Sequence, residues 1–323
     1  PEHHCALFGA DLRCWGRNGG GQLGDGSRLD RTVPIPVAGL PPDLCIVKLG
    51  LGAEHSCALL EDGAVWCWGH NDQGQCSGSK GEHKRYHAPS PVPGVKDAVD
   101  VAAGNSHSCA VVSDGPTAKT HVLCWGDNLF GQLGRQGRMP SAPVDIPKTF
   151  GALELERGGF ESCVRLDSED LVCWGIDSER SGPVGVVLLP PTKVATGVQR
   201  MLKGGSRQCL VKAGGRFECR LISYLLGGSA SSGTLERKNS SMAIMGDFLC
   251  IAPPGGIVTC QELLGREWDG NPAESSNVDN VLGLAASHDQ VCAIQSQNNI
   301  SCWSDVLLSQ VEVKEWLSEA ELA

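Results

Sequence analysis

Cysteine pairs recur along this chain at regular intervals and constrain its fold more than any other feature of the sequence. The two cysteines of a pair stand 9 to 15 residues apart, and successive pairs begin 41 to 54 residues apart. Seven pairs absorb 14 of the 16 cysteines: Cys5/Cys14, Cys57/Cys67, Cys109/Cys124, Cys163/Cys173, Cys209/Cys219, Cys250/Cys260 and Cys292/Cys302. A unit that repeats at this period indicates a repeat architecture, in which each unit packs on its neighbours.

The residues between the cysteines of a pair read as a β-hairpin. When Cys57 is placed opposite Cys67, Glu61-Asp62-Gly63 remain as a three-residue loop whose glycine can adopt a positive φ. The first unit is one residue shorter, and the same arrangement leaves Gly9-Ala10, with glycine where a type II′ turn favours it. Because loop length and cysteine spacing change together, we expect both cysteines of each pair to face each other across two strands.

Each unit offers about four short strands, which is the content of a propeller blade. An alternating or apolar segment such as 97–104 precedes the cysteine pair, and a glycine-rich turn with a Pro/Val stretch such as 91–95 follows it. The sequence therefore predicts an all-β, seven-bladed β-propeller with four short antiparallel strands per blade, in which residues 1–323 form a single domain. A β-helix or open solenoid is the alternative, but its period is usually shorter.

The two ends of the chain suggest how such a ring would close. Cys5 has no room ahead of it for a preceding strand, and no signal peptide is visible, so we expect a mature or excised segment that starts at the second strand of blade one. The C-terminal stretch 305–317 is rich in strand formers, and we expect it to complete blade seven and to close the ring as the missing strand. A terminal amphipathic helix from Glu315 is the competing interpretation.

Further motifs accompany the first cysteine pairs. Units two and three contain Gly52-Ala-Glu-His-Ser-Cys-Ala-Leu59 and Gly104-Asn-Ser-His-Ser-Cys-Ala110, with Trp-Gly after the second cysteine and Gln-Leu-Gly at 22–24 and 132–134. These motifs resemble the regulator-of-chromosome-condensation repeat family, which implies a seven-bladed propeller. The resemblance is partial in unit four, and units five and six lack the tryptophan and glycine of the repeat. The cysteine-paired form is similar to the extracellular repeats of crinkly-type plant receptor kinases and of secreted microbial repeat proteins.

Three kinds of sulfur chemistry compete to explain the pairs. Zinc sites normally use closely spaced Cys-x-x-Cys knuckles, and redox pairs use the same spacing at a helix start; the sequence contains neither. Burial of small residues does not explain seven pairs in matched register. Opposed hairpin positions lie about 4.5–5.5 Å apart at Cα, which a disulfide accepts. We therefore predict seven disulfides and an oxidising compartment, at the cell surface or outside the cell.

Two cysteines and two sequons remain. Cys76 stands where the Gln-Leu-Gly motif has leucine, and a secreted chain seldom leaves thiols unpaired, so an eighth disulfide between Cys45 and Cys76 is favoured over two free thiols. Asn239-Ser-Ser and Asn299-Ile-Ser predict N-glycosylation in the same compartment.

Composition excludes several classes of function. The formal charge is -10, whereas a nucleic-acid partner requires a basic surface. No apolar stretch approaches the length of a membrane span, so we expect membrane attachment only through segments outside this chain. The sequence shows no Gly-x-Ser-x-Gly motif, no phosphate loop and no recurrent carboxylate pair. We therefore expect no enzyme activity, no metal site and no cofactor.

Segments longer than the repeat requires are the candidates for binding: 76–89, 113–121 and 225–233. His83 and Tyr86 lie in the first of them, and Phe130 stands at a turn where its ring is either exposed or tucked between blades. We expect these three residues to contact a protein or glycan partner. The leading hypothesis is an extracellular, non-enzymatic binding or scaffold propeller within a larger secreted or surface protein. The alternatives are a guanine-nucleotide exchange factor for a Ran-type GTPase, and a propeller enzyme acting on glycans or peptides.

Overall fold

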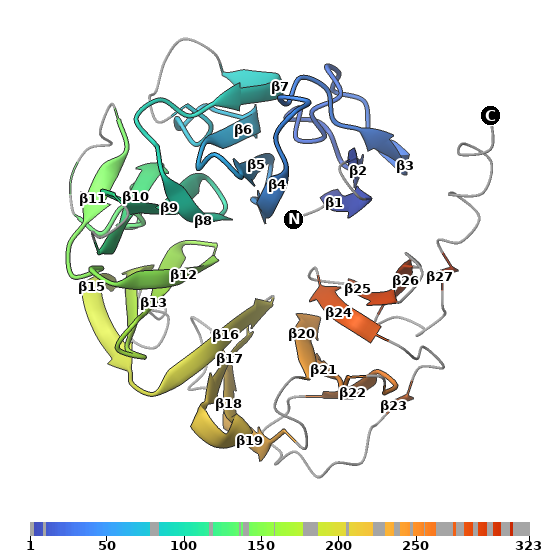
Figure 1. Cartoon of the computed structure of the whole chain (residues 1–323), viewed down its shortest axis with the longest axis vertical. Coiled ribbons are helices and arrows are strands. Elements are labelled where there is room, and N and C mark those ends of the chain that lie inside the picture. Colours follow the sequence, from blue (N-terminus) through green and yellow to red (C-terminus); the bar gives the residue numbers. More distant parts are fainter. Residues whose placement is uncertain are drawn as a thin grey trace. The chain divides into compact units, whose positions relative to one another are not determined.

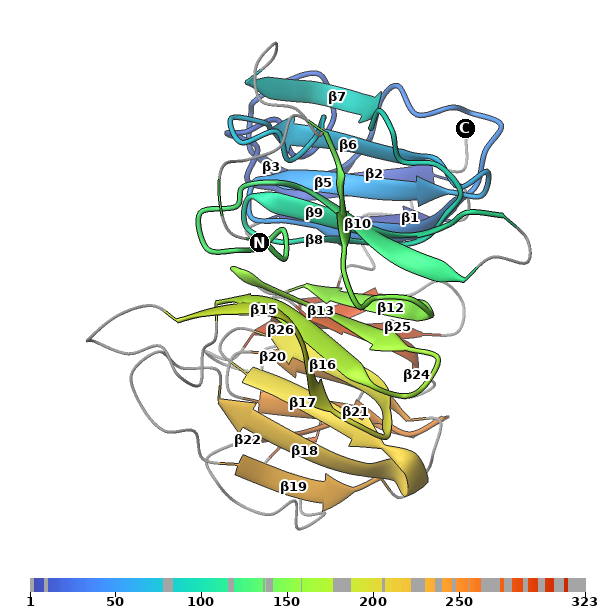
Figure 2. The ribbon, with the colours of Figure 1, turned by 90° about the vertical axis from the view of Figure 1, so that its left-hand side faces the viewer.

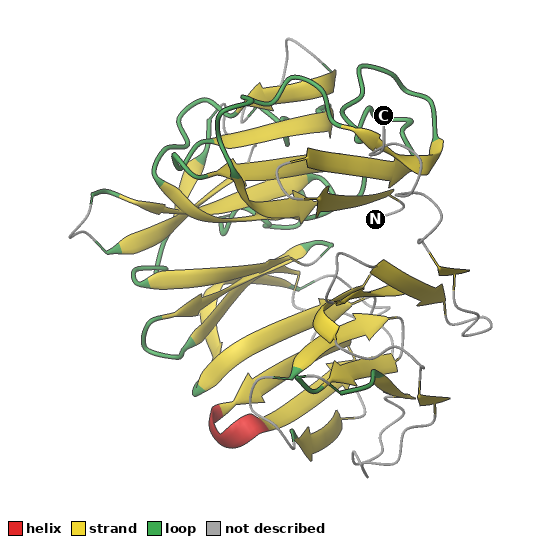
Figure 3. Cartoon of the chain, turned by 45° about the vertical axis from the view of Figure 1, so that its right-hand side comes forward, coloured by secondary structure: helices red, strands yellow, loops and turns green. Residues whose placement is uncertain are grey.

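The chain is built from short antiparallel β-sheets that follow one another along the sequence. The computed structural model describes residues 3–8, 11–77, 84–115, 119–135, 137, 142–157, 159–176, 187–204, 207–221, 230–235, 240–245, 248–254, 256–262, 274–275, 281–286, 290–295, 300–304 and 311–312. The strands and one 3₁₀ turn, η1 (Ala213–Gly215), are shown in Figure 3. Residues 1–197 and 198–323 form two compact units.

The first unit contains four sheets, which lie side by side in chain order in Figure 1. Sheet one has three strands: β1 (His3–Phe8), β2 (Asp11–Gly16) and β3 (Arg31–Pro36). Sheet two consists of β4 (Ile46–Leu51), β5 (His55–Leu60), β6 (Val65–His70) and β7 (Arg85–Pro91). Sheet three consists of β8 (Ala98–Ala103), β9 (His107–Ser113), β10 (Thr120–Gly126) and β11 (Val144–Ile146), and sheet four of β12 (Ala152–Arg157), β13 (Glu161–Leu166), β14 (Leu171–Ile176) and β15 (Leu188–Ala195).

The second unit contains three four-stranded sheets of the same order. They are β16 (Val198–Gly204), β17 (Arg207–Lys212), β18 (Arg216–Leu221) and β19 (Ala230–Thr234); β20 (Ser241–Met245), β21 (Phe248–Ala252), β22 (Thr259–Glu262) and β23 (Glu274–Ser275); and β24 (Val281–Ala286), β25 (Gln290–Gln295), β26 (Ile300–Ser304) and β27 (Val311–Glu312). Each four-stranded meander has the architecture of a propeller blade, so the predicted all-β class and blade content are confirmed.

The hairpin registers agree with the cysteine spacing. Cys57 lies opposite Cys67, and the amide of Leu60 donates to the carbonyl of Ala64 at 2.9 Å, which leaves the three predicted residues as the loop. Gly63 adopts φ +78, as a loop of this kind requires. In sheet one Phe8 pairs with Asp11, so the two-residue connection is also confirmed, although Gly9-Ala10 itself lies outside the described residues.

Ring closure by the C-terminal strand stays a prediction. Sheet one has three strands in the part of the chain that the structure describes, and β27, from the C-terminal stretch, pairs with β26 as the last strand of its own sheet. Residues 313–323, which include the competing helix from Glu315, lie outside the described ranges. The prediction of a single domain is likewise untested.

The apolar core consists of layers between adjacent sheets. Trp125 of β10 packs with Leu59 and Val101 between sheets two and three, and Trp174 of β14 packs with Val111 and Leu155 between sheets three and four. These tryptophans are fully buried. Figure 2 shows β5, β6 and β7 side by side, so that a whole sheet face is available to its neighbour. Within the first unit, sheets two and three are therefore each stabilised by the sheets on either side of them.

The innermost strand of several blades contains a β-bulge at the same position. The register of β4 on β5 shifts between Ile46 and Lys48, which leaves Val47 as the extra residue. Val99 of β8 and Leu153 of β12 occupy the equivalent position. Within the second unit, β16 and β24 carry the same irregularity. A bulge leaves its extra residue outside the ladder and redirects its side chain.

Candidate functional site

Six disulfides each join the two strands of one hairpin, as the spacing predicts. They are Cys5–Cys14, Cys57–Cys67, Cys109–Cys124, Cys163–Cys173, Cys209–Cys219 and Cys250–Cys260. Their Cα atoms lie 3.9 to 4.1 Å apart. Because the pair Leu60 and Ala64 is hydrogen-bonded, alternation along the ladder places Cys57 and Cys67 at a narrow, non-hydrogen-bonded pair. This position brings two strands close enough for the bond.

The seventh pair is only partly described. Cys292 is disulfide-bonded, and its backbone lies opposite Cys302 in the ladder of β25 and β26. The side chain of Cys302 lies outside the described residues, so its bond with Cys292 stays a prediction.

The eighth disulfide is wrong: Cys45 and Cys76 are both free thiols. Cys76 is buried in the core, in the slot that Leu23 and Leu133 fill in the neighbouring repeats, and its thiol donates to the carbonyl of His70 at 3.2 Å. Burial raises the pKa of the Cys76 thiol well above its usual value. Cys45 is exposed ahead of β4, so the two sulfurs occupy different environments and one of them is enclosed by apolar side chains.

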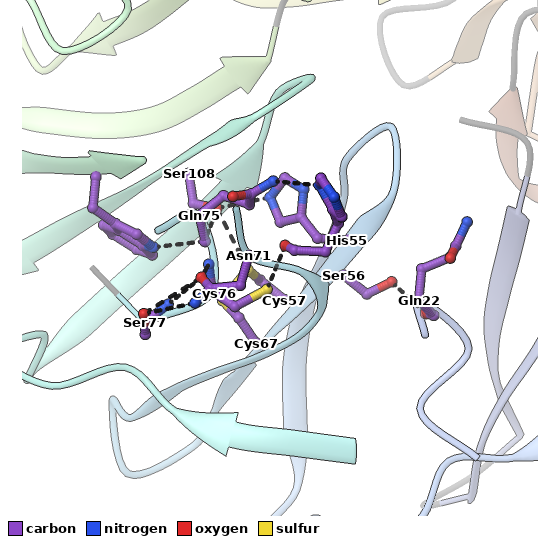
Figure 4. The surroundings of a disulfide bond; sticks show 12 residues. Gln22, His55, Ser56, Cys57, Cys67, Asn71, Gln75, Cys76, Ser77 and Ser108 are labelled. Atoms are coloured by element: carbon purple, nitrogen blue, oxygen red, sulfur yellow. Dashed lines mark hydrogen bonds between the residues drawn. A yellow bond between two sulfur atoms is a disulfide. The ribbon is translucent and has the colours of Figure 1, made fainter. Parts of the chain in front are cut away.

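Around the disulfides, polar groups of the repeat connect one blade to the next. The carbonyl of Gln75 accepts from the hydroxyl of Ser108 at 2.9 Å and from the indole Nε1 of Trp125 at 2.9 Å (Figure 4). Gln75 follows β6 of one blade, whereas Ser108 and Trp125 belong to β9 and β10 of the next. We call this arrangement the inter-blade clasp. All three residues are buried, so their hydrogen bonds satisfy groups that water does not reach.

The clasp repeats along the first unit. The carbonyl of Gln22 accepts from Ser56 at 2.9 Å and from Trp68 at 2.8 Å, and the carbonyl of Gln132 accepts from Trp174 at 2.7 Å. The Gln-Leu-Gly and Cys-Trp-Gly motifs are therefore two halves of one contact. A role for these residues in joining blades was not predicted from the sequence, although Gln-Leu-Gly occurs in units one and three and Gln75 takes its first position in unit two.

Histidines complete each clasp from the earlier blade. His55 Nε2 lies 2.9 Å from the hydroxyl of Ser108, and His107 Nε2 lies 2.7 Å from that of Ser162. His3 makes the same contact with Ser56 at 2.8 Å. Because the Ser108 hydroxyl donates its proton to Gln75, the Nε2 atom of His55 is the donor in their bond. These histidines therefore have structural partners, in agreement with their repeat-encoded positions.

Two blades of the second unit have an apolar residue at the position of the clasp serine. The position of Ser108, one residue before the first cysteine, is taken by Leu249 in β21 and by Val291 in β25, and both are fully buried. Leu249 packs with Phe217 and Met242, and Val291 packs with Val258 and Ala293. The hairpin of β21 and β22 keeps the disulfide register without the tryptophan and glycine of the repeat, whereas Trp303 still follows Cys302 in β26.

One carboxylate in the turn after β2 is strongly shifted. Burial raises the pKa of Asp25, but hydrogen bonds from Arg31, Ser27 and Asn18 outweigh that effect and lower it to about 2. Arg31 Nη2 lies 2.7 Å from Asp25 Oδ2. Asn18 also accepts from the amide of Leu23 at 3.0 Å, so the carboxylate fixes the turn that presents Gln22 to the next blade. We assign Asp25 a structural role.

The predicted partner-binding residues are only partly visible. Phe130 packs edge to face against Phe160 of the next blade, with ring centroids 4.9 Å apart, so its ring is tucked between blades. Tyr86 of β7 is half-buried against two core clusters. His83 and both sequon residues, Asn239 and Asn299, lie outside the described residues, and their roles stay predictions.

The described residues offer little chemistry beyond this framework. Among them, the one cluster with the spacing of a metal site is Glu161, Cys163 and Cys173, and its two sulfurs are already joined to each other. No helix in the described ranges is long and apolar enough to cross a membrane. The described arrangement is a series of disulfide-bonded hairpins joined by buried hydrogen bonds.

Comparison with known proteins agrees with this geometry. Models of the regulator of chromosome condensation (RCC1) repeat match residues 13–59, 62–111, 46–75 and 98–132. The ultraviolet-B receptor UVR8 of Arabidopsis thaliana is 29% identical over 62% of this chain and 46% of its own length. The human E3 ubiquitin-protein ligase HERC2 is 30% identical over 52% of this chain, which is 4% of HERC2. The chain thus spans less than half the length of these relatives.

Solved structures show the same fold at low identity. Human WBSCR16 superposes with a TM-score of 0.70 at 16% identity, covering 91% of this chain and 89% of that one. The ectodomain of the Physcomitrella patens receptor kinase CR4 gives a TM-score of 0.52 at 20% identity, covering 94% of this chain and 73% of that one. The matched residues include Gln22, Gln75 and Gln132, the acceptors of the clasps, whereas Trp174 lies beyond them. Residues 13–132 are therefore repeats of the regulator of chromosome condensation type, set in an all-β chain whose later sheets keep the same cysteine-paired hairpin.

Proposed function

We propose that this chain is an extracellular, non-enzymatic propeller that binds a protein or glycan partner within a larger secreted or surface protein. In this proposal the C-terminal stretch closes a seven-bladed ring. The observation that carries the proposal is the recurrence of one disulfide per blade at one ladder position, six times among the described residues. Bonds of this kind form and persist in oxidising compartments and are rare in the cytosol and nucleus.

Two further observations support this location. The hairpins of the second unit keep a disulfide at the same ladder position although the clasp serine is replaced there, which is expected of a chain that matures in an oxidising compartment. In addition, two solved structures of this fold are described as ectodomains of receptor kinases, CR4 of Physcomitrella patens and ACR4 of Arabidopsis thaliana. A fold alone does not fix a function, so this likeness supports the proposal without deciding the partner.

A guanine-nucleotide exchange factor for a Ran-type GTPase is the second candidate. It is favoured by the repeat match and by the yeast protein Prp20, a regulator-of-chromosome-condensation structure with a TM-score of 0.60 and binding properties towards Gsp1p. That function would place the chain in a reducing compartment. The disulfides argue against it, because a reduced cytosolic or nuclear chain gains nothing from cysteines paired in register.

Thiol counting separates the two candidates. Protein isolated from its native source is alkylated without reductant, under denaturing conditions, and its mass is compared with that of a reduced and alkylated sample. We expect alkylation of Cys45 and Cys76 and protection of the cysteines in the pairs. If most thiols react, the extracellular proposal is refuted. A catalysed release of nucleotide from a Ran-type GTPase would support the second candidate.

A further inference from the structure

The bulge residues of the first unit are exposed and apolar in three successive blades. Val47, Val99 and Leu153 expose 59%, 52% and 46% of their surface. Each is the extra residue of a bulge in the innermost strand, and the ladder therefore does not require its side chain to pack. Single exposed apolar residues are common. Three at one structural position in consecutive blades need a separate explanation.

Contacts between the inner strands make these residues neighbours. Asp100, next to Val99, forms an ion pair with Lys48, next to Val47. The second oxygen of the same carboxylate accepts from the amide of Leu155 in β12 at 2.7 Å. Asp100 thus ties the bulges of β4, β8 and β12 to one another. We call Val47, Val99 and Leu153, which occupy equivalent positions on the three strands linked in this way, the apolar row.

The hairpin turns border this row. The amide of Ala98 donates to the carbonyl of Gly63 at 3.0 Å, so the turn of one blade contacts the start of the next inner strand. The amide of Asp167 donates in the same way to the carbonyl of Gly151 at 2.8 Å. Phe150, which precedes that glycine, exposes 64% of its surface. We define the turn-end surface as Val47, Val99, Phe150 and Leu153 with the exposed charged residues around them.

The charges around the turn-end surface are mainly negative. Exposed acidic side chains are Glu61, Asp62, Asp97, Asp114, Asp167 and Glu169, and exposed basic ones are Lys96, Lys119 and Lys148. Lys119 is moreover paired with Asp167 at 3.6 Å. An apolar row with an acidic border is complementary to a basic segment that also carries aliphatic or aromatic side chains. Two copies of this chain would instead bring like charges together at a symmetric contact.

We propose that the turn-end surface docks a basic protein segment whose apolar side chains cover Val47, Val99 and Leu153. The inference rests on the proposed binding function and specifies its face and the chemistry of its partner. The apolar row supplies the contact area, and the acidic border attracts and orients the segment. Its binding should therefore weaken as the salt concentration rises.

The test uses labelled short peptides and the oxidised full chain. One peptide alternates Lys with Leu; a second has Glu in place of Lys, and a third has Ser in place of Leu. Fluorescence anisotropy should show that the first binds most tightly. The variant Val47→Thr/Val99→Thr/Leu153→Gln should weaken this binding at least about tenfold. Its control, Leu29→Gln/Leu129→Gln, changes leucines that are even more exposed, in the turns at the other strand ends, and should leave binding unchanged.

A second variant keeps the proposal testable if the first variant does not fold. Glu61→Lys/Asp114→Lys changes exposed side chains only and should weaken binding of the Lys–Leu peptide while improving binding of the Glu–Leu peptide. The proposal is overturned if the apolar-row variant binds like the wild type, or if the Lys–Leu peptide binds no better than the others. Self-association of the wild type that is lost in the variant would identify a second copy as the occupant and also overturn it. Thiol counting on the same sample separates this proposal from the proposed function. If the peptides do not bind but the paired cysteines are disulfide-bonded, only the docking surface is refuted. If the paired cysteines are free thiols, the proposed function is refuted.

Discussion

Replacement of Ser108 by alanine measures what one inter-blade clasp contributes to stability. The hydroxyl is fully buried; it donates to Gln75 and accepts from His55 Nε2. Without the hydroxyl, the Gln75 carbonyl still accepts a hydrogen bond from the indole of Trp125, so loss of the bond between Ser108 and Gln75 costs about 1 kcal/mol. The buried donor on His55 loses the acceptor that it faces, which costs about 1–3 kcal/mol. The free energy of unfolding should therefore fall by about 3 kcal/mol.

Equilibrium urea unfolding of the oxidised protein, followed by tryptophan fluorescence, gives this value. Ser56→Ala removes the corresponding hydroxyl between sheets one and two and should have a similar effect. Ser168→Ala, at an exposed turn position, is the matched control and should change stability by less than about 0.5 kcal/mol. If Ser108→Ala behaves like Ser168→Ala, the clasp does not join the blades as argued.

Three further outcomes follow from the structure. Gly126→Ala should unfold the first unit or destabilise it by several kcal/mol, because φ is +103 and a Cβ would lie 2.6 Å from a backbone oxygen and 2.8 Å from His107 Cα; urea unfolding measures this. The pKa of Asp25 is lowered to about 2 in the folded protein, so its ionised carboxylate stabilises the fold fully above its pKa in the unfolded chain, near 4. This stabilisation is lost as the pH falls from there towards about 2. Asp25→Asn should therefore be less stable at neutral pH, and unfolding curves measured over a pH series should lack this loss. Finally, native alkylation followed by peptide mapping should label exposed Cys45 quickly and buried Cys76 only after denaturation, and equal rates would contradict the placement of Cys76.

The local structure was largely predictable because its determinants are adjacent in sequence. Cysteine spacing and the glycine of the 61–63 turn fix the hairpin register, and the structure follows it. The bulge at Val47 was missed, although it breaks the alternation of the strand. A bulge depends on how two strands meet, and the sequence of one strand does not record that.

Long-range contacts were harder to predict for the same reason. The pairing of Cys45 with Cys76 assumed that two leftover thiols meet, whereas Cys76 replaces a buried leucine. The clasp was missed because Gln75 and Trp125 are 50 residues apart and contact each other through a main-chain carbonyl, which every residue possesses. Only the joint recurrence of Gln-Leu-Gly and Cys-Trp-Gly could have indicated it.

The clasp also has a direction along the chain. Its acceptors, the carbonyls of Gln22, Gln75 and Gln132, always belong to the earlier blade, and the serine and tryptophan donors always belong to the later one. During synthesis, the described strands of sheets one to three and both cysteines of each disulfide are therefore present before the donors that secure that sheet leave the ribosome. The first unit can therefore assemble from the N-terminus one sheet at a time, each sheet offering the carbonyl acceptor that the next one binds.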